Sequence, residues 1–176
     1  AVVALLAERI KNAVQHQPPQ MWGAAERQRA EQTLLHFRLC DPACGAGIFL
    51  LAAGEALAQR LAWIRGKETA QDSSSLQQAR QDVQYHCLFG VDVHPPTIAA
   101  CQFMLDLWTG KESPASKNLV ATNSITSSGP SKLWPSIFNK EDEKFDAVIG
   151  NPPFADVRHE YQGARLPLHD FFIMRS

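Results

Sequence analysis

The sequence contains none of the cysteine or histidine patterns that are typical of disulfide-rich or metal-binding proteins. Its four cysteines include no CxxC pair, and its six histidines form no HExxH or similar set. We therefore expect reduced thiols, a cytoplasmic protein and no metal ion. No apolar run is long enough to span a membrane, and we expect no signal peptide. A net charge of −1 argues against a broad basic surface for nucleic acid on this chain.

The composition that remains is ordinary for a globular domain. The 176 residues are 45% hydrophobic and 20% charged, and a chain of this length can bury a real core. Continuous apolar stretches alternate with stretches of helical spacing, which predicts an α/β fold with a mostly parallel sheet. We expect an N-terminal helical segment over residues 1–36, broken near Pro18 and Pro19, and the main body over residues 37–176.

A glycine-rich turn follows the first predicted strand. Residues 37–41 form an apolar run that ends in Asp41, and the turn PACGAG occupies residues 42–47. A helix is predicted to begin near Ile48, because apolar residues then recur at helical spacing. This strand, turn and helix can bind a nucleotide-like ligand. Leu50 stands where a dinucleotide-binding turn needs its third glycine, which argues against NAD.

A second buried strand is predicted over residues 85–92. It ends in Asp92, and an acidic residue at this point of an α/β sheet is placed to accept hydrogen bonds from ribose hydroxyls. Pro95 and Pro96 then open a helix, where a missing N–H group does little harm. The polar stretch between the two units, residues 65–84, has no sustained apolar face, and we interpret it as a surface insertion.

The most specific motif is NPPF, at residues 151–154. It follows the apolar run 145–150, so we expect it at the carboxyl end of a strand. The Asn151 side chain and the Pro152 backbone offer two carbonyl acceptors on a stiff turn, and the Phe154 ring can stack on a planar base. This set suits the methylation of an exocyclic amine. The alternative is a proline-rich turn with Phe154 in the core.

Together these motifs resemble the amino-methylating DNA methyltransferases of restriction–modification systems, of the adenine-N6 type. DPACGAGIFL (41–50) resembles the cofactor loop of that family, GVDVHP (90–95) its second motif, and FDAVIGNPPF (145–154) its catalytic motif. The resemblance implies a Rossmann-like fold, S-adenosylmethionine (SAM) as methyl donor and DNA as partner. It implies catalytic roles for Asn151, Pro152, Pro153 and Phe154. The cofactor contacts that it implies are Asp41, Pro42, Ala43, Cys44, Gly45, Gly47, Phe49, Asp92, Val93 and Asn123.

Two departures from the family's pattern affect these expectations. The family usually carries an acid after its third strand, near the SAM adenine, whereas Asn123 stands at that place here. The proline-containing segment that precedes the first helix of the family, its last strands and its target-recognition region find no match in this sequence. We therefore expect a fragment whose sheet is incomplete at the C-terminal end. DNA would then be bound largely by other regions, together with a specificity or nuclease subunit or domain.

Three other functions stay open. An RNA or protein-glutamine methyltransferase of the same fold could use the same turn, although tyrosine is commoner than phenylalanine as its last residue in the glutamine type. A SAM-binding subunit without catalytic activity would keep the cofactor loop, and the NPPF turn argues against it. A dehydrogenase is disfavoured by Leu50.

Overall fold

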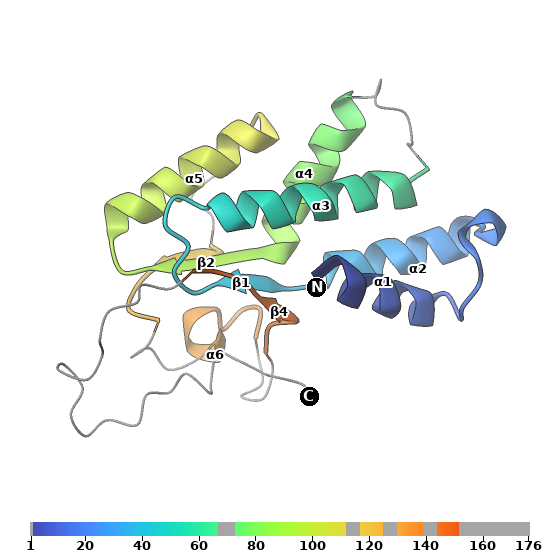
Figure 1. Ribbon diagram of the computed structural model, residues 1–176, viewed down its shortest axis with the longest axis horizontal. Helices are drawn as coiled ribbons and strands as arrows, with labels where there is room; N and C mark the ends of the chain where they lie inside the picture. Colours follow the sequence, from blue (N-terminus) through green and yellow to red (C-terminus); the bar gives the residue numbers. More distant parts are fainter. Residues whose placement is uncertain (1, 67–72, 112–116, 125–129, 139–143, 152–176) are drawn as a thin grey trace.

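The computed structural model describes residues 2–66, 73–111, 117–124, 130–138 and 144–151. Within these ranges, helices and short strands alternate along the chain, as expected for an α/β fold (Figure 1). The elements are α1 (Val2–Ala13), the 3-10 turn η1 (Pro19–Met21), α2 (Ala24–Leu35), β1 (Leu39–Asp41), α3 (Ile48–Ile64), α4 (Ser73–Cys87), β2 (Leu88–Asp92), α5 (Pro95–Thr109), β3 (Leu119–Ala121), α6 (Pro130–Leu133) and β4 (Ala147–Val148).

The four strands form one parallel sheet in the order β3-β2-β1-β4. Leu39 of β1 pairs with Leu88 of β2 on one side and with Ala147 of β4 on the other. Because every strand runs the same way, their carboxyl ends lie along one edge of the sheet. The predicted mostly parallel sheet is thereby confirmed.

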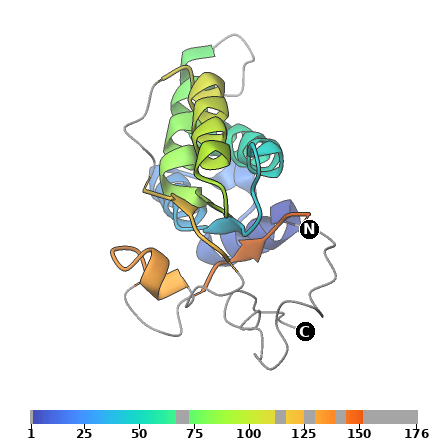
Figure 2. The same cartoon turned by 90° about the vertical axis from the view of Figure 1, so that its left-hand side faces the viewer.

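Each face of the sheet packs against its own hydrophobic core. Successive strand residues point to opposite faces, so Leu39 and Leu88 join the larger core under the helices, whereas Cys40 and Phe89 join the smaller one. Helices α3, α4 and α5 cover the first face, and α6 lies on the other (Figures 1 and 2). The smaller core is mainly aromatic, with Phe89, Trp134, Phe138 and Phe145 in mutual ring contacts.

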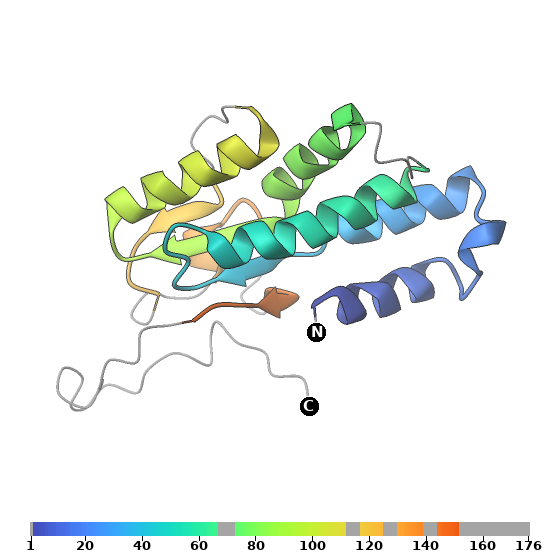
Figure 3. The ribbon, with the colours of Figure 1, turned by 45° about the horizontal axis from the view of Figure 1, so that its top comes forward.

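The N-terminal helices pack beside α3 and extend the larger core. Figure 3 shows α1 and α2 beside α3. Leu6, Ile10 and Val14 are buried with Leu34 of α2 and Leu57 of α3. Arg27 of α2 donates a hydrogen bond to the backbone carbonyl of Ile64 at the end of α3 (2.9 Å). Among the described residues, no helix is long and apolar enough to cross a membrane.

The prediction of a surface insertion at residues 65–84 was wrong for the part that the structure describes, because Ser73–Cys87 forms helix α4. Its buried residues are Ser75, Ala79, Val83, Gln84 and Cys87. Two of these are polar, and Ala79 and Cys87 are small, so the spacing gave little apolar signal. The start of the second strand was also wrong. Residues 85–87 belong to α4, and β2 begins only at Leu88.

A carboxylate network holds α4 against its neighbours. Glu55 of α3 accepts hydrogen bonds from Arg80 of α4 (2.8 and 3.0 Å) and from the indole N–H of Trp108 of α5 (2.8 Å). Gln59 donates a further bond (3.0 Å). The Arg80 hydrogen bond is the main cause that lowers the pKa of Glu55 from 4.5 to about 2, although burial opposes it. Glu55 thus joins three helices above the sheet.

We expect Arg80→Ala to lower the free energy of unfolding by about 1 kcal/mol at neutral pH, because the network is partly exposed to solvent and therefore screened. Since the pKa of Glu55 is lowered by folding, its contribution is complete above about pH 4.5 and is lost as the pH falls towards 2. Urea unfolding at several pH values measures this. Lys11→Ala, which removes an exposed pair with Glu8 (3.9 Å), is the control and should change stability by less than about 0.5 kcal/mol. If both variants lost the same free energy of unfolding, the network would not stabilise the packing of α4.

Candidate functional site

Three predicted site segments meet where the strands end. Asp41 is the last residue of β1, Asp92 is the last residue of β2, and Asn151 follows shortly after β4. The loops that lead to α3 and α5 leave from this edge, at the left of Figure 1. The carboxyl edge of a parallel sheet is where α/β proteins bind their ligands. The structure therefore brings together the cofactor loop, the acidic residue of the second motif and the first residue of the catalytic motif.

The glycine loop is fastened to β2 by backbone hydrogen bonds. The Cys44 N–H donates to the Val91 carbonyl (2.9 Å), and the Gly47 N–H donates to the Cys44 carbonyl (2.8 Å). Gly47 has a φ of 86°, in the left-handed region, and an added Cβ there would lie 2.7 Å from the sulfur of Cys101. Only glycine fits both conditions. These hydrogen bonds and the glycine conformation fix the backbone of the loop that precedes α3.

Asp92 joins this loop to the start of α5. Its Oδ2 accepts the Gly45 N–H (3.2 Å), and its Oδ1 accepts the His94 N–H (2.9 Å). Each carboxylate oxygen can accept a second hydrogen bond, so the side chain keeps capacity for ribose hydroxyls. Its backbone carbonyl accepts the Thr122 N–H (2.8 Å), which brings the residues after β3 beside it. Asn123, the next residue, therefore lies near the end of β2, where the predicted contact with the cofactor requires it.

Asp41 is the more buried of the two acids of the site. Its side chain is fully buried; Oδ1 accepts the Ala43 N–H (3.0 Å), and Oδ2 has no hydrogen-bond partner among the described residues. Burial raises the pKa of Asp41 from 3.8 to about 6; the Ala43 hydrogen bond opposes this, and the charge of Asp92 adds to it. A buried carboxylate oxygen without a donor favours a cationic or hydrogen-bonding ligand.

The pKa of Asp41 gives a test that needs no ligand. Between 3.8 and about 6, the folded chain binds the proton more tightly than the unfolded chain, so stability falls as pH rises through this window. Asparagine mimics the protonated acid. We expect Asp41→Asn to raise the melting temperature by roughly 3 °C at about pH 8 and to change it little at about pH 4.

The matched control is Asp146→Asn. Its carboxylate accepts the Arg38 N–H (2.7 Å) and pairs with Arg9 (2.5 Å), so this substitution should destabilise the chain at about pH 8. Differential scanning fluorimetry at the two pH values compares the variants. A lower melting temperature for Asp41→Asn at the higher pH would show that the Asp41 carboxylate stabilises the fold.

The remaining predicted cofactor residues surround these two acids. Pro42 and Ala43 are partly buried in the loop, whereas Phe49 and Val93 are 44% and 56% exposed. Exposed apolar side chains beside a polar loop are suited to contact with a flat heterocycle. Every predicted cofactor residue therefore lies on or next to the same edge of the sheet.

The structure describes only the first residue of the predicted catalytic motif. Asn151 is exposed directly after Gly150, while Pro152, Pro153 and Phe154 lie outside the described residues. Sequence reasoning missed Gly150 itself. An added Cβ at Gly150 would lie 2.6 Å from Oδ1 of Asp41, so the catalytic segment leaves the sheet against the acid of the cofactor loop.

Comparison with known proteins agrees with this geometry. Residues 28–170 match the protein family described as N-6 DNA methylase. The chain belongs to this family. Its resemblance to amino-methylating DNA methyltransferases and its Rossmann-like fold are thereby confirmed. A family that methylates DNA uses a methyl-donor cofactor, which agrees with a ligand site beside the glycine loop.

A curated relative adds the context of restriction–modification. The chain is 25% identical over 165 residues to the type II restriction enzyme and methyltransferase RM.Eco57I of Escherichia coli. The match covers 76% of this chain and 16% of that protein. The chain therefore corresponds to a small part of its relative.

The cysteines of this N-6 DNA methylase chain are not suited to nucleophilic chemistry. All four are free and buried. Hydrogen bonding to Cys101 is the main cause that raises the pKa of Cys44, and burial adds to it. Burial likewise raises the pKa values of Cys40 and Cys87. A thiol with a raised pKa is a poor nucleophile, so Cys44 has a packing role in the glycine loop.

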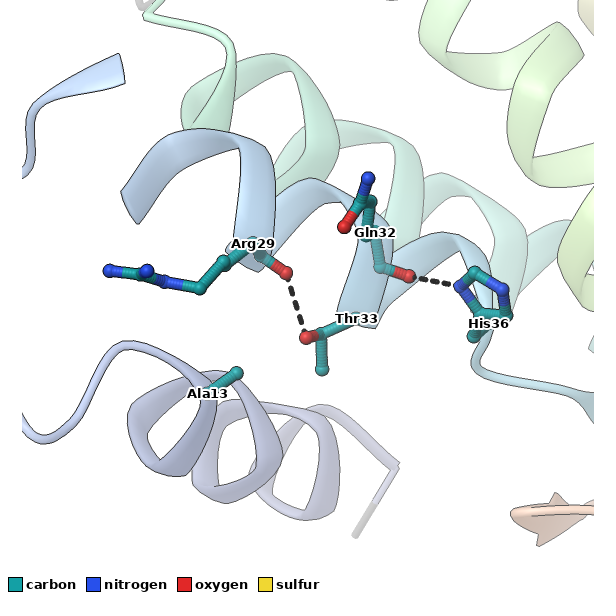
Figure 4. A pocket seen from close by; sticks show the side chains of 5 residues that line it. All are labelled: Ala13, Arg29, Gln32, Thr33 and His36. Carbon is teal, nitrogen blue, oxygen red and sulfur yellow. Dashed lines mark hydrogen bonds between the residues drawn. The ribbon is translucent and has the colours of Figure 1, made fainter. Parts of the chain in front are cut away.

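Two surface hollows lie away from the strand edge that carries the family motifs. The smaller, of about 360 Å³, lies between α1 and α2 and is lined by Ala13, Arg29, Gln32, Thr33 and His36 (Figure 4). Within it, Thr33 and His36 donate hydrogen bonds to backbone carbonyls of their own helix (2.8 and 2.7 Å). The larger, of about 870 Å³, is lined mainly by residues that precede β1, β2 and β3, at the opposite edge of the sheet, together with Phe89, Ser136 and Ile137. Within the described part of the chain, no group of three or more His, Cys, Asp or Glu residues is placed to hold a metal.

Proposed function

We propose that this chain is the cofactor-binding and catalytic part of an enzyme that transfers a methyl group from SAM to the N6 amine of adenine in DNA. Membership of the N-6 DNA methylase family supports the reaction class. The main supporting observation is that Gly150, the residue directly before Asn151, lies against Asp41, the acid of the predicted cofactor loop. Amine acceptor and methyl donor would therefore meet at one edge of the sheet.

The described residues would hold SAM in three places. The charge of the Asp41 carboxylate, whose Oδ2 has no hydrogen-bond partner among the described residues, would attract the cationic methionine part, and Gly45 and Gly47 let the loop approach it closely. Asp92 accepts hydrogen bonds from the ribose, and Asn123 accepts one from the adenine amine through its side-chain carbonyl. SAM, when bound, supplies an electrophilic methyl group on its sulfonium.

The catalytic motif would prepare the amine. Its nitrogen lone pair is delocalised into the adenine ring, and hydrogen bonds from its two N–H groups to the Asn151 side chain and the Pro152 carbonyl free that lone pair for attack. Phe154 stacks on the base and stabilises the cationic amine. SAM would supply the methyl group to this amine and keep the electron pair of the broken carbon–sulfur bond, and the methylated amine would then lose a proton to solvent. No thiolate is needed, in agreement with the raised pKa of Cys44.

The DNA substrate would reach this site as an extruded base, because the amine is inaccessible within a stacked duplex. We propose that other regions of the protein bind the duplex, since the chain corresponds to 16% of RM.Eco57I, a restriction enzyme and methyltransferase. Such a linked nuclease or a specificity subunit is part of the proposal. An intracellular location, where DNA is found and thiols stay reduced, follows from the same function.

The alternative acceptors are RNA and a protein glutamine amide. Both present a planar amine that the Asn151 turn could hold, and a SAM-binding subunit without catalysis is a further alternative. The test uses the protein that carries this chain at its natural length, with SAM labelled on the methyl group and all three acceptors. Label that is released by DNase supports the proposal. Label that is released only by RNase or protease, or no incorporated label, contradicts it.

A further inference from the structure

The contact between Asp41 and Gly150 follows from the register of the sheet. Strands β1 and β4 are parallel neighbours, with Cys40 opposite Val148, and the Ile149 N–H donates to the Cys40 carbonyl (2.9 Å). One step further along both strands, Asp41 comes opposite Ile149, and Gly150 is the next residue of the chain. An added Cβ at Gly150 would lie 2.6 Å from Oδ1 and 3.3 Å from Cγ of Asp41. The carboxylate occupies the place of a side chain at residue 150.

Two independent features require glycine at this position. Its φ of 151° is a backbone conformation that residues with side chains rarely adopt. In addition, the Asp41 carboxylate cannot retreat easily, because Oδ1 is held by the Ala43 N–H (3.0 Å) and the side chain is fully buried. The backbone immediately before Asn151 is therefore fixed against a rigid group of the cofactor loop.

The two oxygens of Asp41 have different partners. Oδ1 accepts the Ala43 N–H and lies against Gly150, whereas Oδ2 is buried without a partner among the described residues. The titratable groups whose charges interact with this carboxylate are Asp92, Cys40 and Cys44. One side chain thus lies between the cofactor loop and the first residue of the catalytic motif.

We propose that Asp41 is a positioning residue for Asn151, and that the absence of a side chain at Gly150 lets it act. Oδ1 sets the direction in which Asn151 leaves β4, while Oδ2 is kept for the cofactor. The geometry of the acceptor site then depends on the same carboxylate as the geometry of the donor site. The contact between Asp41 and Gly150 is observed in the structure, whereas its role in catalysis rests on the proposed function.

The contact is tested first without cofactor or substrate. Heteronuclear NMR follows the Cα resonance of Gly150 while the pH of the chain is varied. Because the charged oxygen lies against that atom, the resonance should titrate with a midpoint near the Asp41 pKa of about 6. Asp41→Asn should abolish the titration. Asp92→Asn should keep it at a lower midpoint, since the Asp92 charge raises the pKa of Asp41. A Gly150 resonance that does not titrate, or that still titrates in Asp41→Asn, overturns the contact.

A double-mutant cycle provides a second measurement that does not depend on assigned resonances. Gly150→Ala should lower the melting temperature by about 5 °C in the natural background and by less than half of that in Asp41→Ala, where the obstructing carboxylate is gone. Gly45→Ala is the matched control. Gly45 also has a left-handed φ, of 54°, but no atom lies within 4 Å of an added Cβ. Gly45→Ala should lower the melting temperature by the same amount in both backgrounds. If Gly150→Ala also lowered it equally in both backgrounds, the proposal would be overturned.

Kinetics separate the failure of this inference from the failure of the proposed function. In the protein at its natural length, Gly150→Ala should lower the rate of methyl transfer at saturating SAM by about 30-fold or more, with a smaller change in the dissociation constant of SAM. A normal rate in Gly150→Ala, in an enzyme that does methylate adenine, overturns the positioning role alone. Absence of adenine methylation in the natural protein, with the NMR titration intact, removes the proposed function and leaves the contact in place.

Discussion

Asn151→Ala should reduce methyl transfer by at least about 100-fold, the scale of losing one preorganised group that acts on the transition state. The side chain supplies one of the two proposed acceptors for the adenine amine, and alanine supplies none. Asn151 is exposed after β4, so its removal leaves the fold unchanged. The dissociation constant of SAM should change by less than about threefold, because the cofactor contacts belong to the ends of β1 and β2.

The measurement is single-turnover methyl transfer, with calorimetry for SAM. Asn12→Ala, an exposed asparagine on α1, is the matched control and should keep the natural rate. A natural rate in Asn151→Ala would remove this residue from the catalytic centre. A parallel loss of rate and SAM affinity would assign it to the cofactor site instead.

Asp92→Ala should weaken SAM binding by at least about 30-fold, corresponding to about 2 kcal/mol. The substitution removes the acceptor that fastens Gly45 (3.2 Å) and His94 (2.9 Å), together with the proposed ribose contacts. The same substitution therefore removes both the hydrogen bonds that hold the glycine loop and the proposed contacts with the cofactor. Isothermal calorimetry of the chain with SAM measures the effect.

Asp92→Asn separates the two causes. An asparagine carbonyl can keep one of the backbone hydrogen bonds but removes the negative charge, so its affinity should lie between those of the natural chain and the alanine variant. Circular dichroism should show that all three proteins are folded. Natural affinity in Asp92→Ala would mean that the end of β2 does not contact the cofactor.

The parts of the fold that could be predicted from the sequence are those whose signals are local. The glycines that follow Asp41 and the apolar spacing after Ile48 predict a strand, a turn and a helix, and α3 begins at Ile48 as predicted. Pro95 likewise opens α5. In these places, residue type and local conformation agree without help from distant contacts.

Helix α4 could not be predicted in the same way. Its buried face includes the polar residues Ser75 and Gln84, and part of its stability comes from Arg80 pairing with Glu55 of another helix. Such a pair is visible only after the two helices are placed side by side. The same reason explains the wrong start of β2, since the helix continues to Cys87 before the strand begins.

In the site, too, the features set by local sequence could be predicted, whereas those set by distant contacts could not. The acids Asp41 and Asp92 could be predicted from their motifs, because each ends an apolar strand. The contact of Asp41 with Gly150 could not, since it depends on β4 pairing with β1 in one particular register. Neighbouring parallel strands can be far apart in sequence, and no local pattern specifies their alignment.

The most direct test of the central claim identifies the methylated atom. The protein that carries this chain at its natural length is incubated with SAM and unmethylated DNA, and the DNA is digested to nucleosides and analysed by mass spectrometry against standards. We expect N6-methyladenine, which is absent with the Asn151→Ala variant. N4-methylcytosine, 5-methylcytosine or unmodified nucleosides would contradict adenine-N6 methylation as the function of this site.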